Sequence, residues 1–408
     1  MAKKKKFRAE FRKNRTPRAR KTDWTRQFDA HGFQEQAPET EERISGRGEM
    51  ARHRTIRAAA AATGPGDAET PFNFLLDVDE TCCRHGRVLS VFGAASSVLG
   101  DDGVAYQCAT RRILKTLSTD DRNPVVAGDR VLFRCGGNKP PQAGWIVEAA
   151  QAIGSESSPG ENVHPREGLI ERVEPRHGTL SRAVRGRRQV IVSNVDQLLI
   201  VASVAEPRLK PNLIDRLLVA AEKGRVRPVL CINKIDLIEP ANLEPLVGVY
   251  CRMGYPVLLV SAKTGFGTDR LRRLVAGRES VVAGQSGVGK SSLLNAIDTN
   301  LHLRVGAVSE ENEKGRHTTT TARLLPIGCG GFVVDTPGMR SFELWDVIPE
   351  EVAGHFRDLR PYVSLCRFPD CTHTHEDDCA VKDAVTDGRL DERRYESYCS
   401  MRSGQVEE

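Results

Sequence analysis

Long apolar runs, a secretory signal and an even set of cysteines are all missing from this sequence. Its best apolar run, Leu198 to Ala205, is as long as a strand, whereas a membrane-spanning helix needs about 20 apolar residues. Residues 1–13 read MAKKKKFRAEFRK, without the apolar core of a secretory signal or the serines of a transit peptide. The 11 Cys favour reduced thiols or metal ligation over a disulfide framework. We expect a cytoplasmic protein without a membrane segment.

The positive charge of the chain is concentrated at one end. Residues 1–26 hold 12 Lys and Arg against 2 Asp and Glu, and the remainder holds 48 against 52. A basic segment of this kind binds polyanions, because it neutralises phosphates and releases their counterions. The same pattern is also typical of a solvated tail. Together with the breaker GPGD at 64–67, it predicts a basic, disordered arm over residues 1–74, with either role open.

The pattern beyond the arm predicts a multidomain protein with three folded parts. Residues 75–180 read as short β segments between Gly and Asp turns, which indicates an antiparallel β-barrel of the OB type. Residues 181–344 alternate buried strands with amphipathic helices, which favours a parallel α/β sheet with its site at the strand carboxyl ends. Residues 345–408 hold a Cys/His-rich segment and a charged helix. The barrel either binds RNA through basic side chains or is purely structural. The basic side chains are Arg84, Arg87, Arg111, Arg112 and Lys115.

A phosphate-binding loop is the strongest single motif. GQSGVGKS fits G-x-x-x-x-G-K-[ST] and lies between a strand and a helix, as the motif requires. Its glycines allow backbone N–H groups to converge on phosphates, and the helix amino terminus adds positive potential. Lys290 is expected to reach the β- and γ-phosphates and to assist catalysis, and Ser291 is expected to bind Mg²⁺. The loop comprises Gly284, Gln285, Ser286, Gly287, Val288, Gly289, Lys290 and Ser291.

Two segments that follow other strands indicate that the base is guanine. A carboxylate at Asp236 can accept the N1–H and N2–H of guanine, whereas adenine offers no such pair of donors. Asn233 and Lys234 would brace the base and the neighbouring loop. The segment SAK is typical of a loop whose backbone contacts the guanine oxygen. The two segments are Asn233, Lys234, Ile235 and Asp236, and then Ser261, Ala262 and Lys263.

Two further segments suit the γ-phosphate and Mg²⁺. Asp335 ends a strand in DTPG, where its carboxylate can hold Mg²⁺ through water, and the N–H of Gly338 can sense the γ-phosphate. Any Thr of the run in GRHTTTTARL can bind Mg²⁺ in the triphosphate state, and we favour Thr319. The Gln that often follows DxxG is absent, since Met339 stands there. Hydrolysis is therefore expected to depend on a partner or on His317 as the water-positioning group, although a loop His is as often a bystander.

The order of these motifs is unusual. The guanine segments come first, and the phosphate loop, the Thr run and DTPG follow. The set resembles a circularly permuted P-loop GTPase, in which the same sheet can form because the chain ends of α/β domains often lie close together. In this order the segment after DTPG leads directly into the C-terminal part. We expect the γ-phosphate to control the placement of that part.

A Cys/His-rich segment predicts a structural zinc site. Residues 366–379 read CRFPDCTHTHEDDC, and three thiolates with one imidazole form a closed tetrahedral set with no position left for catalysis. His375 is a rival for the imidazole ligand. One Zn²⁺ would fold a domain too small to bury its own core. The ligands expected are Cys366, Cys371, His373 and Cys379.

These features together resemble the RsgA family, the GTPases of small-ribosomal-subunit biogenesis. The permuted order, GQSGVGKSS, GRHTTT and the Cys/His spacing carry the resemblance over roughly residues 75–400, and VVAGDRV and PRHGTLSR add to it. It implies that Ser292 also binds phosphate, with GTP or GDP, Mg²⁺ and Zn²⁺ as cofactors. It further implies a factor that binds the small subunit and its rRNA late in assembly, hydrolyses GTP when the subunit stimulates it, and departs. We expect a monomer that does not bind DNA.

Two other functions fit the same motifs. One is a permuted GTPase that serves another RNA particle, which co-sedimentation with small and large ribosomal subunits would distinguish. The other is an RNA-binding module of barrel and zinc domain in which GTP only tunes affinity. Phosphate release stimulated by the subunit would separate this binding module from an enzyme.

Overall fold

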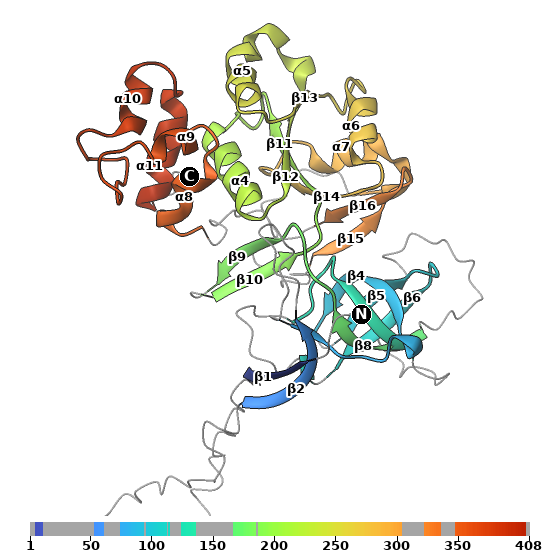
Figure 1. Cartoon of the computed structure of the whole chain (residues 1–408). Coiled ribbons are helices and arrows are strands. Elements are labelled where there is room, and N and C mark those ends of the chain that lie inside the picture. The colour runs from blue at the N-terminus through green and yellow to red at the C-terminus, as the bar shows by residue number, and fades with distance from the viewer. Residues whose placement is uncertain are drawn as a thin grey trace, which may run out of the picture.

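The protein consists of a barrel, a central α/β unit and a small helical unit, as Figure 1 shows. The computed structural model describes residues 5–10, 53–60, 74–93, 95–111, 113–114, 124–135, 166–184, 187–303, 322–335 and 347–404. Short 3₁₀ helices occupy Glu80–Cys82, Ile235–Leu237, Pro240–Leu243, Thr299–Leu301 and Pro349–Glu351. Among the described helices, none combines the length and apolar character needed to cross a bilayer.

The barrel is closed by five strands in the order β4-β5-β6-β8-β7. Neighbouring strands run antiparallel, except that β6 and β8 are parallel. Its interior is filled by apolar side chains such as Val88, Val98 and Ile170, and the rings of Tyr106 and Phe133 lie 4.9 Å apart. The predicted barrel is confirmed, with one parallel pair that local patterns did not reveal. The strands are β4 (Arg84–Phe92), β5 (Ala95–Gly100), β6 (Ala105–Thr110), β7 (Arg130–Cys135) and β8 (Arg166–Val173).

A three-stranded antiparallel sheet precedes the barrel. Its order is β1-β2-β3, with β1 at Lys5–Glu10, β2 at His53–Ala60 and β3 at Phe74–Leu76. The expected disordered arm over residues 1–74 stays a prediction, and within it the structure describes the strands β1 and β2. β1 pairs along its whole length with β2, a strand that lies far along the chain. Composition within a local window does not reveal such a partner.

A buried ion pair fixes the exit of the barrel. Arg176 donates from Nε to Oδ1 of Asp129 at 2.7 Å, and the two side chains are 1% and 0% exposed. Asp129 also accepts a hydrogen bond from Ser193 Oγ at 2.6 Å. Asp129 lies in VVAGDRV, Arg176 lies in PRHGTLSR, and Ser193 follows the hairpin that connects the barrel to the central unit. Their bonds hold these three segments together. That hairpin consists of β9 (Leu180–Val184) and β10 (Arg187–Val192).

A six-stranded sheet forms the central unit, in the order β13-β12-β11-β14-β16-β15. All pairs are parallel except that of β15 with β16. Every residue of β11 is buried, as expected for a central strand covered on both faces. The predicted α/β unit is thus confirmed. The strands are β11 (Gln197–Ser203), β12 (Arg227–Asn233), β13 (Val257–Leu259), β14 (Arg278–Ala283), β15 (Arg323–Pro326) and β16 (Gly331–Asp335).

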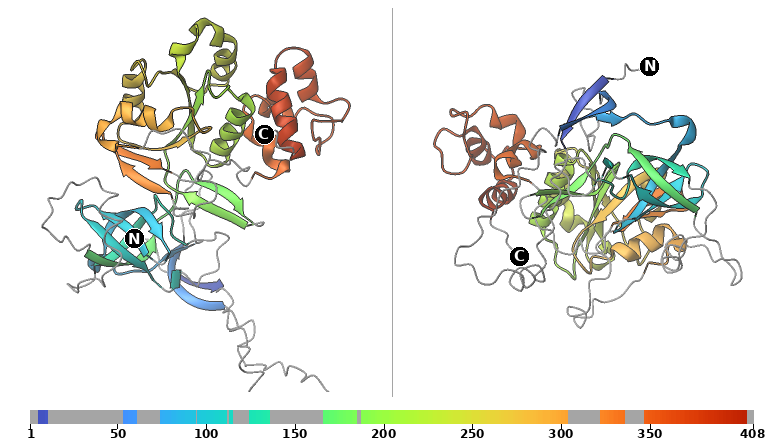
Figure 2. Two further views of the ribbon diagram at one scale, coloured as in Figure 1. Left: turned by 180° about the vertical axis from the view of Figure 1, so that it is seen from behind. Right: turned by 90° about the horizontal axis from the view of Figure 1, so that it is seen from below.

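Helices cover both faces of this sheet, as the two views in Figure 2 show. One buried cluster joins α4 to one side of the strands, and a second joins α6 and α7 to the other. α4 begins with Pro211, whose fixed φ suits a first helical turn, and ends before Gly224. The helices are α4 (Pro211–Lys223), α5 (Glu244–Arg252), α6 (Thr268–Val275) and α7 (Lys290–Ile297).

The C-terminal helical unit packs against α4. Its core includes Val219 of α4 beside Phe356 and Tyr398. Arg394, 1% exposed, lies with Nη1 2.7 Å from Oδ1 of Asp215, and it also binds both carboxylate oxygens of Asp358. Because an unpaired buried guanidinium would be costly, Asp215 fixes α11 against α4, and Asp358 fixes it against the segment between α8 and α9. The helices are α8 (Val352–His355), α9 (Arg360–Val363), α10 (Ala380–Thr386) and α11 (Glu392–Ser403).

Candidate functional site

The predicted nucleotide segments gather at one edge of the central sheet. Asn233 ends β12, Ser261 follows β13, Gly284 follows β14 and Asp335 ends β16. Since these strands are parallel, their carboxyl ends lie at the same edge. The guanine segments lie on one side of β11 and the phosphate segments on the other. The space beyond β11 is therefore where a nucleotide can reach both sets.

The phosphate loop has a backbone that only glycine can supply at two positions. Gly284 has φ of +147°, and a Cβ there would lie 2.0 Å from the carbonyl oxygen of Val201. Gly289 has φ of +89°, and a Cβ there would lie 2.6 Å from Nδ2 of Asn233. The loop therefore approaches β11 and β12 closely. Both positions therefore require glycine, and they are the two glycines that the motif G-x-x-x-x-G-K-[ST] specifies.

The ammonium group of Lys290 lies over this loop. Its Nζ donates to the carbonyl oxygens of Gly284 and Gln285, at 2.8 Å each. Ser291 and Ser292 follow in the first turn of α7, where the helix dipole favours anions. Val288, by contrast, is buried in the core between the sheet and α7 and anchors the loop. The loop thus presents one cation and a helix amino terminus to the same space.

Asn233 holds the guanine and phosphate segments together. Its side chain is 1% exposed, donates from Nδ2 to the carbonyl oxygen of Val288 at 2.9 Å, and accepts from the N–H of Ala262 at 3.1 Å. One amide therefore bonds to the phosphate loop with one end and to the SAK loop with the other. These bonds tie the two loops together, and a role of Asn233 in bracing the base stays a prediction.

Asp236 presents an ionised carboxylate at the guanine side. Its Oδ1 accepts a hydrogen bond from Ser261 Oγ at 2.6 Å, and this bond holds the pKa of Asp236 below its usual value. Lys263 and Lys234 lower the pKa further. Ile235 is buried in the core and anchors the turn that carries Lys234 and Asp236. An exposed, ionised carboxylate is the acceptor that the N1–H and N2–H of guanine require.

The connection after β11 borders the site and was not anticipated from the sequence. Glu206 has φ of +46°, and its carbonyl oxygen accepts a hydrogen bond from Nζ of Lys234. Pro207 lies against the phosphate loop, since a Cβ on Gly287 would lie 3.5 Å from its Cδ. The position of this connection at the end of the central strand was the signal that could have found it.

Several predicted residues receive no structural account. His317, Thr319, Gly338 and Met339 lie outside the described residues, as do two barrel candidates, Arg112 and Lys115. For Asp335 the structure gives the backbone position, opposite Arg323 of β15. A hydroxyl at Ser291 and a carboxylate at Asp335 are oxygen donors of the kind that Mg²⁺ prefers, so this edge fits that ion.

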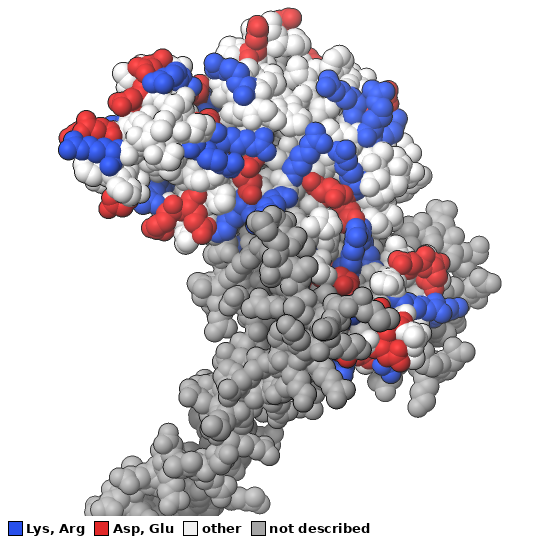
Figure 3. All heavy atoms as spheres, in the orientation of Figure 1, with Lys and Arg blue, Asp and Glu red and all other residues white. Residues whose placement is uncertain are grey.

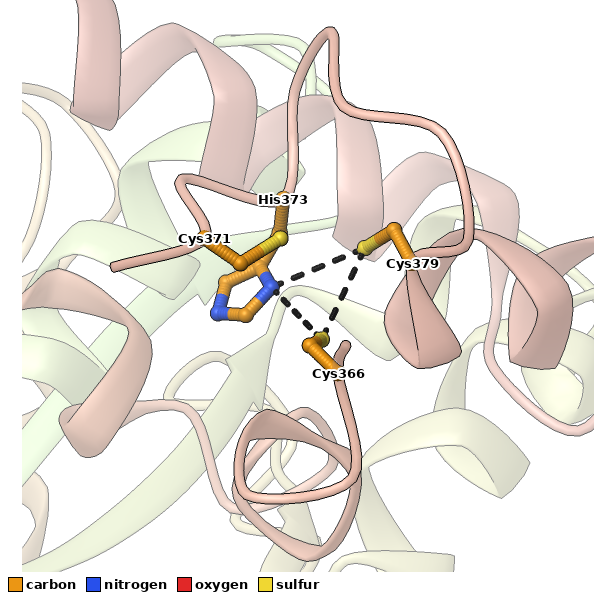
Figure 4. Close-up of side chains that lie close together, drawn as sticks. All are labelled: Cys366, Cys371, His373 and Cys379. Carbon is orange, nitrogen blue, oxygen red and sulfur yellow. Dashed lines mark hydrogen bonds between the residues drawn. The ribbon is translucent and has the colours of Figure 1, made fainter. Parts of the chain in front are cut away.

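The four predicted metal ligands converge, as Figure 4 shows. The donor atoms of Cys366, Cys371, His373 and Cys379 all lie within 4.8 Å of one another. Nδ1 of His373 is 3.3 Å from Sγ of Cys366 and 3.6 Å from Sγ of Cys379. The side chain of His375 is 81% exposed and lies outside this cluster. Three sulfurs and one nitrogen at this spacing fit Zn²⁺.

Neighbouring side chains fix the loop that carries the cluster. Tyr395 and Tyr398 of α11 donate to the carbonyl oxygens of His373 and Thr372, at 2.8 and 2.6 Å. Burial lowers the pKa of His373, so its imidazole is neutral at physiological pH, the form that binds metals. Burial opposes ionisation of Glu376, but hydrogen bonds from Thr372 hold its pKa well below the usual range. The cluster is therefore built into the helical unit.

Comparisons with known proteins agree with this architecture. Residues 173–345 match the family described as RsgA GTPase. A "Small ribosomal subunit biogenesis GTPase RsgA" from Sodalis glossinidius is 39% identical over 320 residues, which cover 77% of this chain and 84% of that protein. The chain belongs to the RsgA family. A relative of the same name from Shewanella oneidensis is 37% identical over 355 residues, which cover 86% of this chain and 91% of that one.

Two solved structures share the fold of this chain. The crystal structure of YjeQ from Thermotoga maritima is 33% identical, with a TM-score of 0.59, and the match covers 79% of this chain and 98% of that one. The structure of YloQ, described as a circularly permuted GTPase, is 28% identical with a TM-score of 0.56 and covers 79% and 94%. The predicted permuted architecture and GTP hydrolase activity of this RsgA-family chain are thereby confirmed.

Proposed function

We propose that this RsgA-family GTPase binds the small ribosomal subunit late in its assembly, hydrolyses GTP when the subunit stimulates it, and then dissociates. The gathering of the guanine segments, the phosphate loop and Asp335 at one sheet edge, in a chain that also has a barrel and a Cys/His-bearing unit, carries the proposal. The names of the relatives refer to biogenesis of the small subunit. The protein would act in the cytoplasm as a monomer and contact rRNA.

The nucleotide is held by residues of both sides of β11. Asp236 accepts the guanine N1–H and N2–H, and this pairing selects GTP over ATP. Lys290 and the backbone N–H groups of the phosphate loop neutralise the phosphates. Ser291, Thr319 and Asp335 would hold Mg²⁺, which supplies further charge neutralisation when it is bound.

Hydrolysis depends on how the attacking water is oriented. Met339 stands where many GTPases have a Gln, and its thioether cannot orient a water as an amide does. His317 is the chain's own candidate for this role. If contact with the ribosomal particle places His317 beside the attacking water, binding and hydrolysis are linked. A slow basal rate and a faster rate on the subunit follow from this arrangement.

In this proposal the barrel contributes basic side chains to the contact with RNA. Arg111 and Arg134 share one carboxylate, Glu171, at 2.8 and 3.3 Å, so the group keeps a net positive charge. Arg84 pairs with Asp102. Figure 3 shows Lys and Arg spread over the central and helical units, interspersed with Asp and Glu. RNA contacts would therefore come from several separated positions and weaken as salt rises.

Zinc would have a structural role in this function. The cluster leaves no ligand position for a substrate once its four protein donors are engaged. It would fold the helical unit, which α4 joins to the nucleotide-binding sheet. The expected consequence of zinc loss is a weaker grip on the ribosomal particle and an intact guanine site.

Two measurements on the full chain test this function. Phosphate release from GTP is followed with small subunits, large subunits or neither, and co-sedimentation is measured with a non-hydrolysable GTP analogue and with GDP. We expect stimulation by small subunits alone, and binding that is at least tenfold tighter with the analogue. Stimulation by large subunits would favour another RNA particle. Binding to small subunits without stimulated release would favour a module in which GTP only tunes affinity.

A further inference from the structure

The barrel touches the nucleotide-binding sheet along its outer edge. In Figure 1, β4 of the barrel lies directly below β15, the last strand of the sheet. Leu89 of β4 belongs to the same buried cluster as Ala322 and Leu324. This contact is therefore a continuous part of the core and not a loose junction between two domains.

Two arginines mark the ends of this contact. At one end, Arg87 of β4 forms a largely buried ion pair with Glu279 of β14, and its guanidinium carbon lies 5.4 Å from the ring centroid of Phe332. Arg87 was among the basic residues expected to face RNA, but it points toward the sheet. At the other end, the guanidinium carbon of Arg323 lies 5.0 Å from the ring centroid of Phe92.

The second end lies at the nucleotide edge. Arg323 begins β15, and its register partner is Asp335, the last residue of β16 and the first of DTPG. Arg323 also follows the Thr run closely in the sequence. Phe92 thus touches the sheet opposite the residue that carries the predicted Mg²⁺ carboxylate.

The ring of Phe92 is a specific partner for Arg323. Nε of Arg323 is buried and has no hydrogen-bond partner among the residues described in the structure. The face of the Phe92 ring, 5.0 Å from the guanidinium carbon, gives this cation an electrostatic partner on the barrel side. An aliphatic side chain of similar size would fill the space and leave the cation without that stabilisation.

We propose that Phe92 and Arg323 are positioning residues for GTP hydrolysis. Their contact fixes the Asp335 end of the β15–β16 hairpin against the barrel. RNA binding by the barrel would thereby affect the position of Asp335 at the Mg²⁺ side of the nucleotide site. The first half of this inference concerns the isolated chain. The second half rests on the proposed function, because it requires a ribosomal particle that binds the barrel.

The test compares side chains with and without a π face. In the free, full-length protein, Phe92→Leu and Arg323→Gln are expected to raise the Mg²⁺ concentration that half-saturates binding of a fluorescent GTP analogue by about three- to tenfold. The affinity of both variants for GDP without Mg²⁺ is expected to stay within twofold of wild type. Phe92→Tyr keeps the aromatic ring and should have the wild-type Mg²⁺ dependence. Leu169→Ala, a change at an exposed barrel position, serves as the control for general damage to the barrel.

With small subunits, the same variants separate positioning from docking. Phe92→Leu and Arg323→Gln are expected to lower the subunit-stimulated kcat at least fivefold. The subunit concentration that gives half-maximal stimulation should stay within threefold of the wild-type value. Unchanged Mg²⁺ dependence in both variants, or equal loss in Phe92→Tyr, would overturn the inference. A lost affinity for subunits with full kcat would overturn it as well. If wild-type protein is not stimulated at all, the proposed function fails, and the Mg²⁺ titration still decides the positioning role.

Discussion

The candidate guanine-nucleotide site, called the guanine site below, and the Cys/His cluster are built in opposite ways. The candidate site draws on strand ends from Asn233 to Asp335, and close backbone approaches and one bridging amide hold it together. The metal cluster draws on residues 366–379 alone and is held by side-chain donors. The first arises from the topology of a sheet, whereas the second arises from the spacing within one loop.

This difference predicts different sensitivities. The sheet supports the guanine site even without a ligand, since its strands are buried on both faces. The loop around the cluster is short, and α11 holds its backbone through two hydrogen bonds, so we expect its fold to depend on a bound metal. Damage to the cluster should therefore affect folding, and damage to the guanine site should affect binding alone.

The largest expected effect is loss of a metal ligand. Cys379→Ser is expected to remove Zn²⁺ and to unfold the helical unit, because zinc binding supplies about 10 kcal/mol or more in comparable small sites. Zinc content by atomic absorption and helix content by circular dichroism would show this. Cys251→Ser, at an exposed cysteine outside the cluster, is the matched control. Full zinc content in Cys379→Ser would contradict the assigned ligand set.

A smaller effect is expected from the guanine carboxylate. Asp236→Asn keeps the acceptor for Ser261 but replaces one guanine acceptor with a donor, so GDP affinity should fall about a hundredfold. Xanthosine diphosphate should gain affinity, because its C2 carbonyl accepts from the new amide. Fluorescence titration measures both constants. Asp269→Asn, at an exposed acid of α6, should leave both unchanged. An equal response of the two variants would mean that Asp236 does not read the base.

The next largest effect is expected on zinc affinity, from loss of the hydrogen bonds that hold the loop around the Cys/His cluster. Glu376 accepts hydrogen bonds from the N–H and hydroxyl of Thr372 and from the N–H of Thr374, at 2.7, 2.6 and 3.1 Å. Glu376→Gln should weaken zinc affinity about tenfold or more, as is typical of groups that orient metal ligands. Competition with a chelator measures this affinity. Asp377→Asn removes the same charge at an exposed neighbouring position and should have no effect. If both variants bind zinc equally well, the hydrogen bonds of Glu376 are dispensable.

The smallest effect concerns pH. The pKa of Asp236 lies below its ordinary 3.8, so the carboxylate stays ionised as the pH falls from 7.5 to 5. Protonation would weaken guanine binding only on passing through that lowered pKa. The ratio of GDP to ADP affinity cancels the titration of the phosphates and should stay constant within twofold over this range. A ratio that declines steadily from pH 7 would show that another titrating group reads the base.

Sequence reasoning was strongest where chemistry is contiguous. The phosphate loop, with Gly284 and Gly289, and the spacing of Cys366 and Cys379 could be read directly, because each motif requires particular residues within a few positions. The alternation of strands and helices also gave the central sheet. His373 and His375 could not be separated by spacing, and it was the burial of His373 beside the thiols that separated them.

Long-range partners were beyond local patterns. Arg87 resembled a surface cation until its pairing with Glu279 placed it between barrel and sheet. The strand β1 was invisible because its partner β2 lies more than forty positions along the chain. The two hydrogen bonds by which Asn233 contacts two different loops depend on the register of three strands. Each of these features is fixed by tertiary packing, which a window of sequence does not contain.

The proposed function requires a single guanine nucleotide bound where the separated segments meet. Isothermal titration calorimetry of the full chain with a non-hydrolysable GTP analogue and with its adenosine counterpart tests this directly. We predict one guanine nucleotide bound per chain and affinity for the adenosine compound at least a hundredfold weaker. Equal affinity for the two compounds, or no heat of binding with the GTP analogue, would contradict the account.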